Sequence, residues 1–300
     1  MNLLVSIIGP TGIGKTNLSI KLANYFNSEI ISCDSRQFYK ELSIGTSKPN
    51  NKQLNIVKHH FIGHKTILDN YTVYNYYIDV YKKMEELYKQ YNILFLVGGS
   101  LLYEKSIING INYIPYINRK RLLIYRDKLY KKDNSYLIKK LIKEDYNYYK
   151  ILKNKKDNRK IIRALEVKYF TKKKLSSYFN ENNKKSKPFN KYLRIGLIDS
   201  RENIYNRINR KVDDMIKNGL IDEIEKIKQY KELHALNTIG YKEFFQYNNL
   251  YKIITTIKKN TRNYAKKQII WLRKMKDVNW FNPNEFNRIK NKIIYILNNI

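Results

Sequence analysis

The sequence predicts an α/β protein built on a doubly wound parallel sheet, with an all-helical subdomain inserted into the chain. Three observations predict this architecture. Apolar runs alternate with amphipathic segments over the first 100 residues, a glycine-rich loop joins the first apolar run to the first helix, and no convincing strand occurs between Pro115 and Pro188. We therefore assign residues 1–114 and 191–300 to an α/β core with C-terminal helices, and residues 115–190 to the inserted helical subdomain.

The first strand is the apolar run at residues 3–8, which ends at Gly9 and is typical of a strand buried in a parallel sheet. A helix over residues 15–26 follows, because apolar residues recur there at intervals of four. Similar patterns predict strands over residues 30–33, 93–100 (broken by Gly98 and Gly99) and 193–200, and helices over residues 79–90, 201–218, 221–231 and 251–276. The carboxyl ends of parallel strands meet at one edge of a sheet, so the residues that follow these strands should converge on one site.

The composition favours a polyanionic partner. The chain carries 59 Lys+Arg against 26 Asp+Glu, and its formal net charge of +33 makes a nucleic acid the first partner to consider. A joint excess of Lys, Asn, Ile and Tyr is also typical of A+T-rich codon usage, so the charge alone does not decide the partner. The single Cys33 excludes an internal disulfide and a zinc site built on paired cysteines, and no stretch approaches the roughly 18 apolar residues of a membrane helix. We expect a cytoplasmic monomer without a signal peptide.

Residues 9–16 have the sequence GPTGIGKT and match the phosphate-loop pattern G-x-x-x-x-G-K-[ST] of ATP-binding proteins. The loop follows a predicted strand and opens a predicted helix, which is the context that the motif requires. We expect the backbone N–H groups from Gly12 to Thr16 to face phosphate oxygens, the Lys15 ammonium to add a point charge and the Thr16 hydroxyl to hold Mg²⁺. The predicted fold is therefore P-loop NTPase-like, with Mg²⁺ as its cofactor.

Asp34 follows the second predicted strand, beside the phosphate loop. Its carboxylate can act as a general base towards a nucleophile, or it can be the N-cap of a helix that begins at Ser35, and the residues alone leave both interpretations open. The third strand ends in Gly98, Gly99 and Ser100 and lacks the acidic residue with which ATPases of this type hold magnesium, so ATP hydrolysis is disfavoured. A kinase of a nucleoside or small metabolite, and the transfer of another group to a nucleophile, both remain open.

Two basic clusters lie outside the phosphate loop. The stretch DNRKIIRALEV places Arg159, Lys160 and Arg163 within one turn of a predicted helix. Residues 260–274 interleave cations with aromatic rings, on which single-stranded RNA bases can stack, but a solvated basic face is the simpler interpretation. The histidine pair at residues 59–60 lacks the further ligands of a metal site, and we expect it to pack or to hydrogen-bond within a loop.

Several stretches, in order over nearly the whole chain, match one family. They are GPTGIGKT (9–16), ISCDSRQFY (31–39), SIGTSKP (43–49), HHFIG (59–63), LVGGSLLYEK (96–105), DNRKIIRALEV (157–167), RINRKVDDMIKNGLIDEI (207–224), TIGYKE (238–243) and TRNYAKKQIIWLR (261–273). They resemble the bacterial tRNA dimethylallyltransferases, also called tRNA isopentenyltransferases. The GTSKP, RALEV and IGYKE stretches have no counterpart in ordinary P-loop kinases.

The resemblance implies transfer of a dimethylallyl group from dimethylallyl diphosphate to N6 of the adenine on the 3′ side of the anticodon in tRNA, with release of pyrophosphate. It makes Asp34 the base that takes the N6 proton, and it places Ser100, where the family usually has Thr, near the reacting amine. With these two, Lys15 and Thr16 complete the implied catalytic set. The implied diphosphate-binding residues are Gly9, Pro10, Thr11, Gly12, Ile13, Gly14, Lys15, Thr16, Arg210 and Lys211. Lys211 stands where the family commonly has Arg, and lysine keeps the charge but loses the bidentate fork.

The resemblance also implies which residues contact the anticodon stem-loop of tRNA. These are Asp34, Ser35, Arg36, Gln37, Ser100, Arg121, Arg159, Lys160, Ile161, Ile162, Arg163, Asn237, Thr238, Ile239, Gly240, Tyr241 and Lys242. The target adenine must leave its stack to enter a pocket, which costs free energy, and contacts between basic residues and phosphates can offset this cost. The expected partners are tRNA and dimethylallyl diphosphate.

Overall fold

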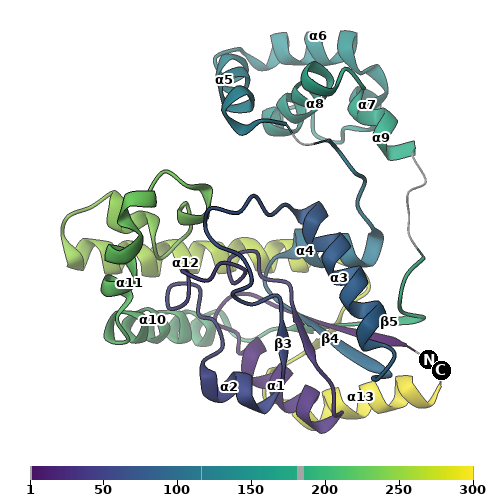
Figure 1. Ribbon diagram of the computed structural model, residues 1–300, viewed down its shortest axis with the longest axis vertical. Helices are drawn as coiled ribbons and strands as arrows, with labels where there is room; N and C mark the ends of the chain where they lie inside the picture. Colours follow the sequence, from purple (N-terminus) through teal and green to yellow (C-terminus); the bar gives the residue numbers. More distant parts are fainter. Residues whose placement is uncertain (1, 116, 181–185, 300) are drawn as a thin grey trace. The chain divides into compact units, whose positions relative to one another are not determined.

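The computed structural model describes residues 2–115, 117–180 and 186–299, which form two compact units (Figure 1). The larger unit comprises Met1–Asn109 and Lys187–Ile300, and the smaller comprises Gly110–Ser186. The smaller unit is therefore an insertion between the two segments that build the larger one. Each unit has a hydrophobic core of its own.

A six-stranded sheet forms the centre of the larger unit, and every neighbouring pair of its strands is parallel. The strand order is β3-β2-β4-β1-β5-β6, which confirms the predicted doubly wound α/β fold. The strands are β1 (Leu3–Ile8), β2 (Ile30–Ser32), β3 (His59–His60), β4 (Ile93–Val97), β5 (Lys191–Leu197) and β6 (Asn279–Phe281). The edge strands β3 and β6 have only two and three residues, too few for a recognisable sequence pattern.

Strand β1 lies at the centre of the sheet, between β4 and β5. All six of its residues are buried, which explains why the run is apolar rather than alternating. The strands end together at one edge, where Cys33 N donates to the Val97 carbonyl at 2.8 Å. A Cβ on Gly98 would lie 2.5 Å from the backbone of Cys33, so this close approach of the chain after β2 and β4 requires glycine.

Helices cover both faces of this sheet, with α3 and α4 on one face and α1 and α13 on the other (Figure 1). Helix α3 begins at Val73, earlier than the sequence predicts, because Thr72 and Asn75 form a capping box at its start. No helix in the described ranges has the length and apolar character needed to cross a membrane. The helices of the larger unit are α1 (Lys15–Tyr25), α2 (Asn51–Ile56), α3 (Val73–Leu87), α4 (Leu101–Asn109), α10 (Arg201–Lys217), α11 (Leu220–Ile227), α12 (Leu250–Leu272) and α13 (Phe286–Asn298), with short 3₁₀ turns η1 (Lys228–Tyr230), η2 (His234–Leu236) and η3 (Lys242–Phe245).

Helices α10 and α12 pack against each other and stand beside the carboxyl edge of the sheet. Val212 of α10 and Ile253 and Ile257 of α12 form one small core cluster between them. Ile208 of α10 and Ala265 of α12 join the main core under the sheet instead. The two helices therefore join the main core towards one end, and towards the other end they pack on each other, on α11 and on η3.

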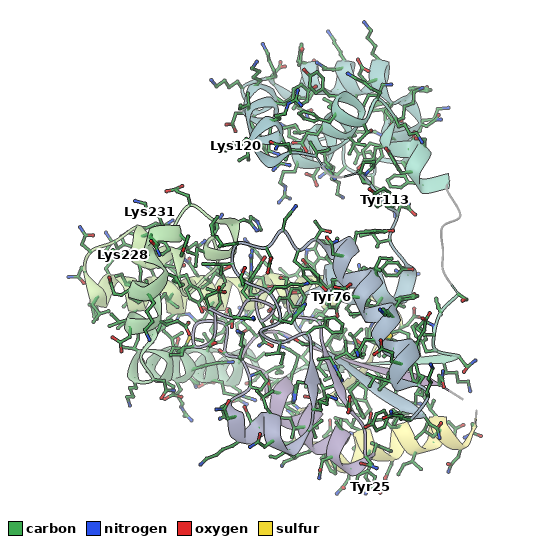
Figure 2. All side chains as sticks on the ribbon, in the orientation of Figure 1. Tyr25, Tyr76, Tyr113, Lys120, Lys228 and Lys231 are labelled. Atoms are coloured by element: carbon green, nitrogen blue, oxygen red, sulfur yellow. The ribbon has the colours of Figure 1, made fainter. Side chains whose placement is uncertain are left out.

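A buried polar network ties α4 to the central strands. The Glu104 carboxylate is fully buried, and its Oε1 accepts from Arg194 Nε at 2.8 Å and from the Tyr192 hydroxyl at 2.5 Å. Tyr76 is also buried inside this unit, where its hydroxyl donates to the Ser32 carbonyl at 3.0 Å (Figure 2). Breaking a buried ion pair leaves an uncompensated charge and costs about 3–5 kcal/mol. The ion pair between Glu104 and Arg194 therefore helps to fix the start of α4 and the loop before it.

The smaller unit is helical throughout its described residues, as the sequence predicts. Its helices are α5 (Arg119–Tyr130), α6 (Asn134–Glu144), α7 (Tyr146–Ile151), α8 (Asn158–Thr171) and α9 (Leu175–Asn180). Leucines of α6 and aliphatic residues of α8 form its core. Arg126 donates two hydrogen bonds, at 2.6 and 3.0 Å, to the buried Glu166 carboxylate and thereby joins α5 to α8.

Candidate active site

A cavity of about 780 Å³ lies at the carboxyl edge of the sheet, entirely within the larger unit. Its lining comes from the phosphate loop, from residues 34–37 after β2, from Gly99 and Ser100 after β4, from loops near residues 45–50 and 237–240, and from α10 and α12. The structure thus brings the phosphate loop, Asp34 and Ser100 into one cavity. This is the convergence that the positions of the strand ends predict.

The phosphate loop has the backbone geometry of an anion cradle. Gly12 and Gly14 adopt positive φ angles of 77° and 101°, which residues with a side chain rarely adopt. Gly12 also packs so closely on α10 that an added Cβ would lie 2.8 Å from the Ile208 side chain. Lys15 curls over the loop and donates to the carbonyls of Gly9 and Pro10, each at 2.9 Å. Its ammonium is therefore held beside the loop by the backbone.

Two partly buried lysines of the cavity, Lys15 and Lys211, lie near the Asp34 carboxylate. The pKa of Lys15 is lowered to about 8, mainly by desolvation; Asp34 opposes this shift and Lys211 contributes to it. Burial also lowers the pKa of Lys211, again against the attraction of Asp34. A bound anion would relieve this unfavourable positive charge, so the electrostatics favour a negatively charged ligand.

Asp34 precedes a turn and not the helix that its interpretation as an N-cap requires. Its Oδ1 accepts a hydrogen bond from Arg36 N at 3.0 Å, so the carboxylate caps the turn after β2. The same side chain lines the cavity, and its charge acts on Lys15 and Lys211. The carboxylate is therefore oriented by the turn and available to a ligand, while its role as a base stays a prediction.

Ser100 lies close to Asp34 through a contact with Ser35. The Ser100 hydroxyl oxygen accepts from Ser35 N at 3.1 Å and lies 3.2 Å from the Ser35 hydroxyl. The loop after β4 and the loop after β2 are thus joined by side-chain hydrogen bonds. Both residues line the cavity, where the sequence places them.

Helix α10 corrects one predicted diphosphate ligand. Arg210 is exposed and does not line the cavity, whereas Lys211 does, so Arg210 leaves the predicted diphosphate-binding set. The physical reason is the period of the helix: Ile208 and Lys211 share the inward side, and Arg210 projects from the other. Arg207, one turn before Lys211, lines the cavity instead and was not predicted.

Arg207 is held in place by the loops around it. Its guanidinium forms an ion pair with Asp199, which follows β5, and Nη1 donates to the Ile13 carbonyl of the phosphate loop at 3.3 Å. Asp199 is an acidic residue at a strand end that the prediction missed, because only the ends of the first three strands were considered. The guanidinium is thus fixed beside the phosphate loop, with Nε, Nη1 and Nη2 each donating to a protein oxygen.

The predicted tRNA-binding residues of the larger unit fall into two groups. Asn237, Thr238, Ile239 and Gly240 line the cavity, as do residues 34–37. Tyr241 and Lys242 do not line it. Tyr241 is fully buried, and its hydroxyl donates at 2.7 Å to Glu223, whose carboxylate also accepts from the backbone of residues 43–45. We correct its role: Tyr241 supports the loop at residues 43–45, and a Cβ on Gly45 would collide with its ring at 2.5 Å.

The predicted tRNA-binding residues of the smaller unit also divide by burial. The Arg159, Lys160 and Arg163 side chains are exposed by 84%, 59% and 43%, and Arg121 is exposed as well. In contrast, Ile161 and Ile162 are buried in the core of this unit and cannot offer their side chains to RNA. The exposed cations remain the predicted RNA contacts on α5 and α8.

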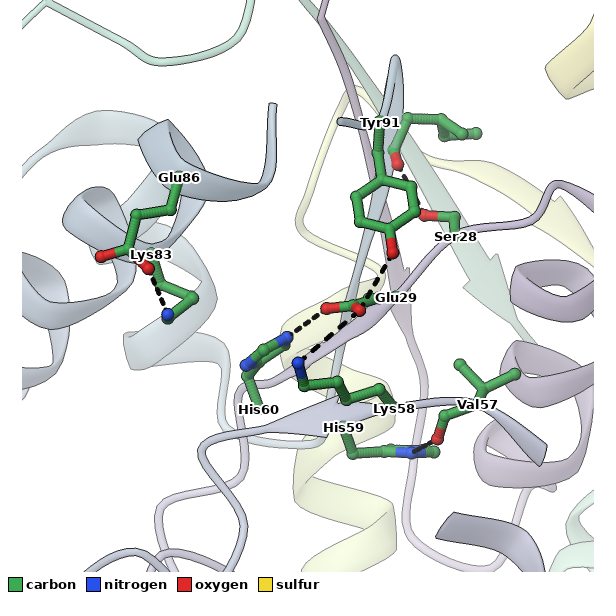
Figure 3. A network of polar contacts seen from close by, with 10 residues as sticks. Ser28, Glu29, Val57, Lys58, His59, His60, Lys83, Glu86 and Tyr91 are labelled. Atoms are coloured by element: carbon green, nitrogen blue, oxygen red, sulfur yellow. Dashed lines mark hydrogen bonds and ion pairs between the residues drawn. The ribbon is translucent and has the colours of Figure 1, made fainter. Parts of the chain in front are cut away.

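The histidine pair forms hydrogen bonds, as the sequence predicts (Figure 3). His60 Nε2 lies 2.5 Å from Glu29 Oε2, and the same carboxylate accepts from the Tyr91 hydroxyl at 3.1 Å. His59 Nδ1 lies 2.7 Å from the Val57 carbonyl. Among the residues that the structure describes, no three His, Cys, Asp or Glu side chains are grouped as metal ligands.

Helix α12 contributes cavity residues from a segment whose simpler interpretation was a solvated face. Ile257, Thr261, Tyr264 and Gln268 line the cavity at intervals of three to four residues. The Gln268 side chain is almost fully buried and reaches the phosphate loop, where it accepts from Thr11 N at 2.9 Å. The helical spacing of these four residues was visible in the sequence, but only the packing of α12 on α10 shows which side faces the cavity.

The chain is similar to known proteins of one family. A family model described as IPP transferase matches residues 37–275. The chain is 44% identical to the tRNA dimethylallyltransferase of Christiangramia forsetii, over 97% of this chain and 99% of that protein. It resembles the crystal structure of the full-length tRNA isopentenylpyrophosphate transferase from Bacillus halodurans, with a TM-score of 0.72, 31% identity and coverage of 100% of this chain and 98% of that one. It also resembles a eukaryotic dimethylallyltransferase acting on tRNA, with a TM-score of 0.77, 28% identity and coverage of 96% of this chain and 75% of that one.

We predict that the affinity for inorganic pyrophosphate falls as the pH rises through about 8, because Lys15 then loses its proton and no longer attracts the anion. The fall should approach tenfold per pH unit above the pKa, although pyrophosphate itself gains negative charge over this range. Calorimetric titrations between about pH 6.5 and pH 9.5 measure this dependence. In Lys15→Arg the guanidinium stays charged, so the fall should be much smaller. An equally steep fall in both proteins would contradict the assignment to Lys15.

Proposed function

The chain belongs to the tRNA dimethylallyltransferase family, also described as IPP transferases, and from this premise we propose that it transfers a dimethylallyl group from dimethylallyl diphosphate to tRNA. The proposed acceptor is N6 of the adenine on the 3′ side of the anticodon, and the leaving group is pyrophosphate. The observation that carries the proposal is the meeting of an anion cradle, a carboxylate and an apolar wall in one cavity.

The diphosphate of the donor would occupy the phosphate loop. The N–H groups at the start of α1 face this position, and the dipole of α1 adds positive potential. Lys15, Arg207 and Lys211 supply three cations around the same place. Stabilising the negative charge that gathers on the diphosphate lowers the barrier to breaking an allylic carbon–oxygen bond.

The dimethylallyl group would lie on the apolar side of the cavity. Helix α10 lines this side with three apolar residues at helical spacing, Ile208, Val212 and Met215, of which Ile208 is nearest to the phosphate loop. Ile257 of α12 lines the same side. Ile239 lines the cavity from the loop before η3. A five-carbon group buried here would contribute favourable free energy of about 0.8 kcal/mol per methylene-sized unit.

In the transfer step the bond between C1 of the dimethylallyl group and the bridging oxygen breaks, and its electron pair leaves with the diphosphate. The N6 nitrogen forms the new bond to C1. Asp34 accepts the proton that N6 loses, which is needed because the adenine amine is a weak nucleophile. Ser100 and Ser35 lie next to this carboxylate and can hydrogen-bond to the acceptor amine.

The residues at the start of α1 fit Mg²⁺, which we propose as the cofactor. Thr16 lines the cavity and offers a hydroxyl oxygen, and Mg²⁺ prefers oxygen ligands shared with phosphate groups. When bound, the ion would neutralise charge on the diphosphate. Lys15 and Arg207 share this task and keep the anion oriented.

The tRNA would present its anticodon loop to the cavity with the target adenine turned out of its stack. Residues 34–37 and 237–240 would surround the base, while the exposed cations of α5 and α8 contact phosphates. We also propose that the protein acts as a monomer in the cytoplasm, since one chain supplies the whole cavity and its single thiol, Cys33, is buried and unpaired.

The activity is tested by mixing the protein with Mg²⁺, labelled dimethylallyl diphosphate and a tRNA with adenine next to the anticodon. We expect label in the RNA and release of one pyrophosphate per group transferred. A tRNA with guanine at the target position is the matched control and should stay unlabelled. Transfer of phosphate from ATP to a nucleoside, without labelled RNA, would instead identify a kinase.

Asp34→Asn should reduce the turnover number by at least about 10² while tRNA affinity stays within about twofold, because the amide keeps the shape but cannot take the N6 proton. Steady-state kinetics and filter binding measure the two effects. Glu85→Gln, which changes an exposed carboxylate on α3, is the matched control and should leave both quantities unchanged. Near-normal turnover by Asp34→Asn would remove Asp34 from the role of base.

The double variant Arg159→Ala/Arg163→Ala should weaken tRNA binding and lower the slope of log affinity against log salt by about 1 for each phosphate that the protein no longer neutralises. Both side chains are exposed on α8, so the fold should not change. Binding titrations at several salt concentrations measure the slope, and pyrophosphate affinity is the internal control. Unchanged tRNA affinity together with weaker pyrophosphate binding would show that α8 does not contact RNA.

A further inference from the structure

One buried side chain, that of Gln268, connects the phosphate loop to the loop after β4. Gln268 of α12 is only 6% exposed. Its Oε1 accepts from Thr11 N of the phosphate loop at 2.9 Å, and its Nε2 donates to the Gly99 carbonyl after β4 at 2.9 Å. A single side chain therefore spans from the loop after β1 to the loop after β4.

The two loops carry different parts of the proposed reaction. Thr11 belongs to the cradle for the donor diphosphate. Gly99 precedes Ser100, whose hydroxyl oxygen accepts from Ser35 N at 3.1 Å, and Ser35 follows the proposed base Asp34. A continuous path of covalent and hydrogen bonds thus leads from the donor cradle, through Gln268, to the group that takes the proton.

The chemistry of this bridge matches a side-chain amide. Thr11 offers an N–H donor and Gly99 offers a carbonyl acceptor, and the Gln268 amide presents one acceptor and one donor on separate atoms that reach both. A carboxylate would face the Gly99 carbonyl with a second acceptor, and an ammonium would face the Thr11 N–H with a second donor. The fit is also close, because a Cβ on Gly99 would lie 2.9 Å from Gln268 Nε2.

We propose that Gln268 is a positioning residue that fixes the distance between the donor cradle and the proposed base. The inference rests on the proposed prenyl transfer. The donor carbon and N6 must approach to about 3–3.5 Å before they react, and a displacement of about 1 Å can cost about 10² in rate. Gln268 touches neither the proton nor the new bond; it keeps the two loops at the separation that the reaction needs.

The test compares Gln268→Ala and Gln268→Met with the wild-type protein. The turnover number should fall by about 10- to 100-fold, while the Michaelis constants for tRNA and for dimethylallyl diphosphate change by less than about threefold. Pyrophosphate affinity in the absence of tRNA should also stay within about threefold, since the cradle itself is intact. Asn263→Ala, at an exposed position of the same helix, is the control and should behave as wild type.

A second perturbation reaches the bridge from its other end. Gly99→Ala pushes a methyl group towards Gln268 Nε2, so it should lower turnover in the same way without weakening pyrophosphate binding. Because both changes break one interaction, the double variant Gln268→Ala/Gly99→Ala should be no slower than the slower single variant. If the Gln268 variants fold poorly, Gly99→Ala alone tests the proposal, because the positioning role requires that its turnover falls while its affinity for pyrophosphate does not.

Turnover at the wild-type level in Gln268→Met, or losses that multiply in the double variant, would overturn the positioning role. A fall in pyrophosphate affinity large enough to account for the whole loss of activity would also overturn it, because Gln268 would then only support the donor cradle. These outcomes are distinct from failure of the proposed function, in which wild type and Asn263→Ala would both fail to label tRNA.

Discussion

The site depends above all on the parallel pairing of β1 with both β4 and β5. Parallel strands end at a common edge, so this pairing alone places the residues after β1, β4 and β5 side by side. All six residues of β1 are buried, so packing on both faces fixes the strand between β4 and β5. Gly98 completes the arrangement, since the chain after β4 meets Cys33 at a distance that admits no side chain. The positions of the phosphate loop and of Asp34 are therefore consequences of the sheet.

This geometry concentrates more positive than negative charge in one cavity. Lys15 and Lys211 are both partly buried, and desolvation lowers the pKa of each while Asp34 only partly opposes the shift. Such an arrangement is unfavourable in itself and becomes favourable when an anion enters. The stability lost by burying these charges is thus linked to the affinity for a diphosphate, and the +33 charge of the whole chain steers polyanions towards the same protein. Local and global electrostatics select the same class of ligand.

How much of this was predictable depends on whether a feature is local in the chain. The phosphate loop was fully predictable, because its backbone geometry is encoded in eight consecutive residues, and Asp34 and Ser100 followed from strand ends. The sequence could not show that Arg207 lines the cavity and Arg210 does not. Contacts of α10 with Gly12 and α12 determine which side of the helix faces the cavity. Gln268 was missed for the same reason. Tyr241, Ile161 and Ile162 show the opposite error: matching a motif does not distinguish a residue that contacts the ligand from one that supports its neighbours.

Two of the cations of α10, Arg207 and Lys211, bear on how a lysine can stand at position 211. A guanidinium offers a planar fork, whereas an ammonium offers a mobile point charge, and a diphosphate needs at least one fixed, directional partner. Arg207 can be that partner, because Asp199 and the Ile13 carbonyl hold it against the phosphate loop. Lys211 then has only to supply charge, and its burial makes that charge strong by excluding water. The loss of one fork is tolerated because orientation and charge are provided by different residues one helical turn apart.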